Sequence, residues 1–220
     1  CIGPVQRAVV DLSQSDILAL HTTGKQIVAA PGAGKMIQPV APPLLSFTVG
    51  ATQYSGSGNT TLTYDYSLAV APDPGTETTA MLVGRESNVR SLPPAQLVTD
   101  TTAFENKALV FSNDSANGFN YGIPDDFEVD DGGADWAPDD TFVLYADGSG
   151  DDAACTVLTT GMGGVVETIS CEGAGNGFLT GVHDAEEASG MGTGLTIDIP
   201  SVTKGNGALR VTILYTVVDL

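Results

Sequence analysis

The sequence predicts an all-β fold, an antiparallel β-sandwich with a loop-rich acidic insertion. Its 220 residues include 27 glycines and 12 prolines, which oppose long helices and favour short strands joined by turns. Hydrophobic residues make up 42% of the chain and its mean hydropathy is +0.10, so the chain can bury a core. About eight to ten short segments have strand character, which is enough for two packed sheets.

The first strands surround a reverse turn. Pro31 fixes φ, and Gly32 and Gly34 permit positive φ, so this turn can reverse the chain between two short apolar runs. In the N-terminal half, strands are expected at residues 5–12 with 17–21 as a continuation, and at 25–30, 35–40, 44–49 and 61–70.

The final strand shows the clearest alternation of apolar and polar residues. Its apolar residues are Leu209, Val211, Ile213, Tyr215 and Val217, and they alternate with Arg210, Thr212 and Thr216. The other strands of this half are expected at residues 80–84, 95–98, 103–112 and 141–145, in a hairpin spanning 155–171, and at 195–199. This order is compatible with a jelly roll and equally with an immunoglobulin-like sandwich, so the connectivity stays open.

The chain is expected to form a single domain over residues 1–220. Residues 1–12 are expected to form an N-terminal arm or first strand, and residues 113–140 the acidic, loop-rich insertion, which contains the only tryptophan, Trp136. Eleven Asp and Glu residues lie between positions 125 and 152. We interpret this stretch as a solvated face.

The formal charge of −19 excludes some partners. The chain has 8 Lys and Arg residues against 27 Asp and Glu residues, and it would therefore repel nucleic acid and anionic membrane surfaces. No apolar run approaches the roughly 18 residues of a membrane span. Neither nucleic acid nor a membrane is expected as a partner.

Two of the three cysteines are candidates for a disulfide. Cys155 and Cys171 bracket a hairpin, and a three-residue loop at 162–164 would place them opposite each other, close enough to bridge. The alternative is a pair of small, buried or half-buried thiols, which a cytoplasmic assembly would favour. Cys1 has no assigned role.

The sequence predicts no enzyme, no catalytic residue and no cofactor. Only His21 and His183 could act as the base that activates a nucleophile, and no G-x-S-x-G elbow is present. Residues 32–35 resemble part of a phosphate-binding loop, but Ala29 stands where the loop needs its first glycine and Met36 where it needs Ser or Thr.

Calcium is the metal that the sequence suggests best. Asp147, Ser149 and Asp151 offer oxygen ligands at positions one, three and five of a loop. However, Asp152 replaces the glycine at position six and Leu158 the glutamate at position twelve. An ordinary acidic turn is therefore the favoured interpretation, and no metal site is expected.

The two ends of the chain resemble a known family. Residues 17–37, ILALHTTGKQIVAAPGAGKMI, and residues 205–220, GNGALRVTILYTVVDL, are similar to the opening strand, Pro-Gly-Ala-Gly-Lys turn and closing strand of tailed-bacteriophage capsid decoration (cement) proteins. The resemblance implies a jelly-roll-like fold. It also implies a structural virion protein that binds the outer capsid surface and stabilises it by bridging neighbouring major capsid subunits.

The resemblance further implies the partners and the place of the protein. It points to the major capsid protein and to a homotrimer as partners, and to the outer capsid surface after synthesis in the host cytoplasm. The docking elements expected are the N-terminal arm and the turn near residues 31–35. The partner-binding candidates are Val5, Gln6, Arg7, Pro31, Gly32 and Lys35.

An alternative hypothesis is a receptor- or carbohydrate-binding module of a phage tail or head fibre. Aromatic side chains are the platforms on which sugar rings stack, and Phe119, Tyr121, Phe127 and Trp136 cluster in or beside the insertion. This cluster would serve as the recognition loop.

Overall fold

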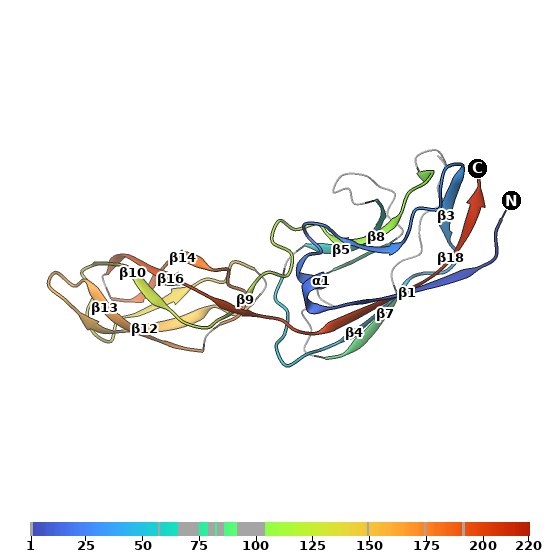
Figure 1. Ribbon diagram of the computed structural model, residues 1–220. Coiled ribbons are helices and arrows are strands. Elements are labelled where there is room, and N and C mark those ends of the chain that lie inside the picture. Colours follow the sequence, from blue (N-terminus) through green and yellow to red (C-terminus); the bar gives the residue numbers. More distant parts are fainter. Residues whose placement is uncertain are drawn as a thin grey trace. The chain divides into compact units, whose positions relative to one another are not determined.

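A computed structural model describes residues 2–56, 58–65, 75–78, 82, 86–91, 104–148, 150–173, 175–190 and 192–220 (Figure 1). The chain forms two compact units. Unit 1 consists of Cys1–Phe119 and Gly205–Leu220, and unit 2 of Asn120–Lys204. Nearly all of the regular structure is antiparallel β, which confirms the predicted fold class.

The described strands of unit 1 form two antiparallel sheets. The order in sheet A is β1, β18, β4, β7, with β3 also paired to β18, and the order in sheet B is β2, β8, β5, β6. Sheet A consists of β1 (Gln6–Leu12), β3 (Lys35–Pro39), β4 (Leu44–Thr48), β7 (Asn88–Ser91) and β18 (Ala208–Asp219). Sheet B consists of β2 (Lys25–Val28), β5 (Asn59–Tyr64), β6 (Gly75–Thr78) and β8 (Leu109–Asn113).

The final strand, β18, is the centre of sheet A. β1 pairs along one side of it, from Leu209 to Tyr215. On the other side, β4 pairs with its first half and β3 with its second half. Leu209, Val211 and Ile213 are almost fully buried and pack against sheet B residues such as Phe111, so the inner faces of both sheets share one core. The alternation in the sequence is confirmed at Leu209, Val211 and Ile213, but it fails further along the strand, where Thr216 is buried and Tyr215 and Val217 are half-buried.

A short helix replaces the expected continuation of the first strand. Residues 17–21 were expected to be extended, but α1 spans Gln14–Leu18 and is followed by turns. Its Ile17 and the following Leu20 are fully buried in the core of unit 1. Two side chains from this short helical segment therefore fill one part of the core of unit 1.

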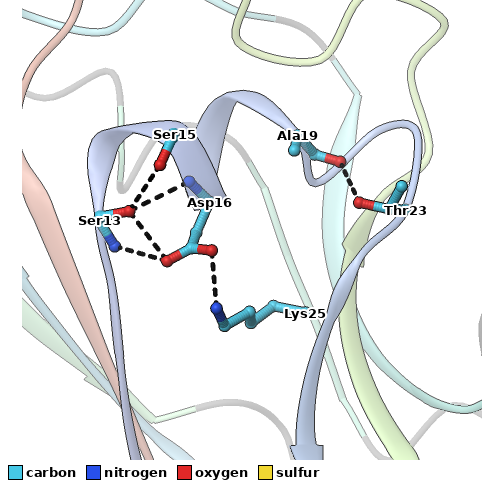
Figure 2. Close-up of polar contacts among 6 residues, drawn as sticks. All are labelled: Ser13, Ser15, Asp16, Ala19, Thr23 and Lys25. Carbon is cyan, nitrogen blue, oxygen red and sulfur yellow. Dashed lines mark hydrogen bonds and ion pairs between the residues drawn. The ribbon is translucent and has the colours of Figure 1, made fainter.

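A capping box explains why this helix begins where it does (Figure 2). The backbone N–H of Ser13 donates to Asp16 Oδ2 over 3.0 Å, and the backbone N–H of Asp16 donates to Ser13 Oγ over 3.3 Å. Lys25 Nζ donates to Asp16 Oδ1 over 2.7 Å, which ties the helix to the start of β2. This side-chain hydrogen bond is the main cause that lowers the pKa of Asp16.

Unit 2 has its own core between two further sheets. The sheet orders are β10, β16, β14 and β13, β12, β11, β15, and β9 pairs with β17. Trp136, Phe142, Phe178 and Ile197 are among the residues of its core, all at most 3% exposed. The strands are β9 (Gly122–Pro124), β10 (Glu128–Ala134), β11 (Thr141–Leu144), β12 (Ala153–Thr160), β13 (Val166–Glu172), β14 (Gly181–Asp184), β15 (Glu186–Ser189), β16 (Thr193–Ile199) and β17 (Val202–Lys204).

This division differs from the expected single domain with an insertion at residues 113–140. The inserted unit spans Asn120–Lys204 and includes strands, such as β10 and β14, that the sequence left as loops. Both strands contain acidic residues and glycine, so their local propensity for strand is low, and pairing with β16 decides their conformation. Some expected strands lie wholly or mainly outside the described residues. They are those at 80–84 and 95–98, and the end of the one at 61–70. Jelly-roll connectivity stays a prediction.

We expect Asp16→Asn to lower the free energy of unfolding at pH 7 by about 1 kcal/mol, because it removes a capping carboxylate and its ion pair. The pKa of Asp16 is lowered from 3.8, so its contribution is present above that pH and is lost as the pH falls further. Denaturant unfolding from pH 7 to acid should therefore show the two proteins converging. Glu172→Gln, which removes one exposed negative charge from unit 2, is the control; equal behaviour of both variants would contradict the prediction.

We expect Ile213→Ala to lower the free energy of unfolding by about 2–5 kcal/mol, since it opens a cavity between sheets A and B. Leu214→Ala, on the opposite face of the same strand and 39% exposed, should cost less than about 1 kcal/mol. Urea unfolding of both variants measures the difference. Similar losses would mean that the inner face of β18 does not carry the core.

Candidate binding surface

The N-terminal arm presents apolar side chains to solvent. Ile2 is 75% exposed and Val5 is 64% exposed, although both belong to a segment that is fixed to β18. The backbone N–H of Gly3 donates to the Val217 carbonyl over 2.9 Å. Exposed apolar side chains on a well-anchored backbone are typical of an interaction site, because little conformational entropy of the backbone is lost when a partner buries them.

Gln6 and Arg7 lie at the start of β1 and differ in what they contact. The Tyr215 hydroxyl donates to Gln6 Oε1 over 2.9 Å, so Gln6 is held by its own sheet. Arg7 is exposed and lies directly across from Leu214 of β18. Of the two polar candidates, Arg7 is therefore the better placed to meet a partner.

The turn that contains Pro31, Gly32 and Lys35 is fixed from two sides. The N–H groups of Gly32 and Gly34 donate to the side chains of Asn106 and Glu105, over 2.9 and 2.6 Å. The N–H of Leu220 donates to the Gly34 carbonyl over 2.8 Å. Gly32 and Gly34 have φ of 99° and 73°, as the sequence predicted for this turn. The exposed end of the turn is thus a rigid feature.

The structure brings the two predicted docking elements together at the C-terminal end of β18. Val218 pairs with Ile2 of the arm on one side and with Met36 of β3 on the other. Figure 1 shows both termini and β3 at this end of unit 1. The sequence suggested each element separately, and the strand pairing makes them one surface.

Sequence reasoning missed the outward-facing side of sheet A. The described part of unit 1 has eight exposed large hydrophobic side chains, and all lie on the strands of sheet A or in the segments directly flanking them. They are Ile2, Val5, Val9, Val40, Leu44, Val89, Leu214 and Leu220. One feature of the sequence could have revealed this surface: Leu214 is apolar at a position of the strand where alternation predicts a polar, outward-facing residue.

The charge of the chain is divided unevenly between the units. Unit 2 contains 17 Asp and Glu residues and a single basic residue, Lys204, so its formal charge is −16. Unit 1 contains 10 acidic and 7 basic residues, a formal charge of −3. Most of the net negative charge of the chain, and of the electrostatic potential that it creates, therefore belongs to unit 2.

The suggested calcium ligands do not form a cluster in the part of the chain that the structure describes, where no group of three or more acidic, His or Cys side chains could hold a metal ion. Asp147 Oδ2 instead accepts from the Leu179 N–H over 2.8 Å, and Oδ1 lies 3.8 Å from His183 Nδ1. Ser149 lies outside the described residues, and the Asp151 carbonyl accepts from the Asn176 N–H. These hydrogen bonds join the acidic loop to Asn176 and Leu179 of a later segment of unit 2.

Cys155 and Cys171 form a disulfide in unit 2. They are directly opposite each other on β12 and β13, with their Cα atoms 4.0 Å apart. The N–H of Gly161 donates to the Val165 carbonyl, which leaves residues 162–164 as the three-residue loop that the sequence suggested. Cys155 is 2% exposed, so the bridge joins a core position to the half-buried Cys171.

The aromatic residues of the alternative hypothesis are not available for stacking on a sugar. Phe119 is fully buried in the core of unit 1. Tyr121 is 5% exposed and Trp136 is 3% exposed, the latter in the core of unit 2, where Phe127 packs against the cluster. Three of the four aromatic residues that the sequence grouped are therefore buried, and Phe127 is half-buried against the core of unit 2.

No protein-family model matches the chain, and neither a curated protein nor a solved structure matches it. Among the described residues, no helix is both long and apolar enough to cross a membrane.

We expect loss of the disulfide to destabilise unit 2 by about 3 kcal/mol, as the chain-entropy estimate gives for a closed loop of this length. Thermal unfolding of Cys155→Ser/Cys171→Ser should show this loss, and a reducing agent should reproduce it in the native sequence. Cys1→Ser should leave unfolding unchanged. Titration of three free thiols in the oxidised, denatured protein would contradict the bridge.

Proposed function

We propose that this chain is a non-enzymatic structural protein of a bacteriophage particle that binds the outer capsid surface. It stabilises the shell by bridging neighbouring major capsid subunits. Each contact is of modest strength, and several contacts made by one rigid protein add up to stable attachment.

The convergence of the two resembling stretches is the observation that carries this proposal. Residues 17–37 and 205–220 are far apart in the sequence, yet β3 pairs with β18 and the turn at Gly34 accepts a hydrogen bond from Leu220. The ends of the two resembling stretches therefore lie side by side in sheet A, whereas residues 25–28 of the first stretch form β2 of sheet B. Beside these ends lies the arm with exposed Ile2 and Val5, which supplies apolar area for docking.

The distribution of charge supports a role for unit 1 as the anchor. In the proposed homotrimer, contacts between copies and with coat subunits use unit 1, whose formal charge is −3. Three copies of unit 2, each with a charge of −16, repel one another and face solvent. The fibre-module alternative is not developed further, because its aromatic platform is buried.

Particles that lack this protein should lose integrity at a lower temperature, or after a smaller reduction of the salt concentration, than complete particles, and added purified protein should restore the resistance. Electron cryomicroscopy should then show density at three-fold or quasi-three-fold positions, with the N-terminal arm against coat protein. Light scattering of the purified protein should give three times the 22.5 kDa chain mass.

Bovine serum albumin or another protein of similar acidity, added in the same amount, controls for non-specific protection. Unchanged stability of particles without the protein, or density confined to the tail, would refute the proposal.

A further inference from the structure

Unit 2 has a large negative charge that basic side chains do not compensate. None of its 17 acidic residues is buried, and its formal charge is −16. Among the described residues of this unit, no Lys or Arg forms an ion pair with a carboxylate, and Lys204 donates instead to the side-chain oxygen of Asn120. Like charges that are held together in a compact unit repel one another and favour its unfolding.

Strand register places some of these charges directly opposite each other. Glu128 of β10 lies across from Asp198 of β16, so two carboxylates occupy the same face of neighbouring strands. Opposed like charges destabilise a sheet. Tyr145 also reports the local field, because the negative charge of Glu186 is the main cause that raises its pKa. Salt screens such repulsions, and ionic strength should therefore affect the stability of unit 2 strongly.

The disulfide between Cys155 and Cys171 acts against this repulsion. It joins β12, in the interior of its sheet, to β13, which pairs only with β12 among the described strands. Val166 of β13 belongs to the core of unit 2, so detachment of β13 would open that core. Because the bridge restricts the unfolded chain, it favours the folded unit by about two orders of magnitude in the folding equilibrium.

We propose that unit 2 is a redox- and salt-sensitive conformational switch. With the bridge closed, unit 2 stays folded at low ionic strength. With the bridge reduced to two thiols, unit 2 stays folded only where salt screens its acidic residues. Neither condition alone opens the unit, since the bridge offsets the repulsion and screening weakens it. This inference goes beyond the proposed function and does not depend on it.

Opening of unit 2 also weakens unit 1 through the chain that connects them. In folded unit 2 the pairing of β9 with β17 joins the two ends, so the connection between β8 and β18 is short. Unfolding replaces it by a flexible segment that includes all 85 residues of Asn120–Lys204. By the dependence of loop closure on length, the pairing of β18 in sheet A then becomes about 30-fold less favourable.

The chain has a selective reporter for the test, because its only tryptophan, Trp136, is 3% exposed in the core of unit 2. Its fluorescence is recorded on the purified full-length protein from about 1 M to about 10 mM NaCl, with and without dithiothreitol. This dithiol reduces the bridge to two thiols and is itself oxidised to a cyclic disulfide. The emission should become that of denatured protein only after reduction and at low salt. The amide hydrogens of β18 should then exchange more than about tenfold faster, as measured by mass spectrometry.

Matched variants test the role of charge. Glu128→Gln/Asp198→Asn removes the opposed pair and, in reduced protein, should lower the NaCl concentration at half-transition by about twofold or more. Glu86→Gln/Asp219→Asn removes two exposed acidic residues of unit 1 and should leave that concentration nearly unchanged. Without any reductant, Cys155→Ala/Cys171→Ala should behave as the reduced native protein does, and its fluorescence at high salt shows that it folds.

Several results would overturn the switch. Reduced native protein that keeps its native fluorescence at low salt would do so, and so would oxidised protein that loses it there. Reduced protein that is unfolded even at high salt would mean that the bridge alone decides the fold. Equal shifts from the charge variants of both units would mean that the charges of unit 2 are not the cause. Unchanged exchange of β18 after unit 2 has opened would refute the coupling to sheet A.

Discussion

The pairing of β18 on both of its sides is the constraint on which unit 1 depends. Its partners β1, β3 and β4 come from the first quarter of the chain, whereas β18 is the last strand, so sheet A needs residues 205–220 to acquire its centre. The pairing of Gln6 with Tyr215 closes nearly the whole chain into a loop. Contacts of such long sequence separation are entropically costly and form slowly.

Unit 2 reduces this cost, because its own ends are joined. β9 pairs with β17, and Lys204 Nζ donates to Asn120 Oδ1 over 3.1 Å at the point where the inserted segment begins and ends. Once unit 2 has folded, the 85 residues of Asn120–Lys204 act as a short connection between β8 and β18. The insertion of unit 2 before β18 therefore adds little to the entropic cost of forming sheet A.

The two units also differ in the character of their surfaces. Unit 2 concentrates acidic side chains around a disulfide-bridged core, and such a surface stays hydrated and resists association. Unit 1 has a much smaller formal charge of −3, and exposed apolar side chains occur in both units. The two units thus differ mainly in charge, with −16 in unit 2 and −3 in unit 1.

From the sequence we could predict the all-β class, the buried side chains in the first half of β18, the turn at Pro31–Gly34 and the opposition of Cys155 to Cys171, because alternation and turn chemistry act over a few residues. It could not reveal the second core, since β10 and β14 are strands through pairing and not through propensity. Tertiary structure alone decided that Trp136 is core, that Ile2 and Met36 flank Val218, and that Val9, Leu44 and Leu214 share one face. These are relations between residues that are distant in the sequence, and they depend on which strands pair, which a local pattern does not reveal.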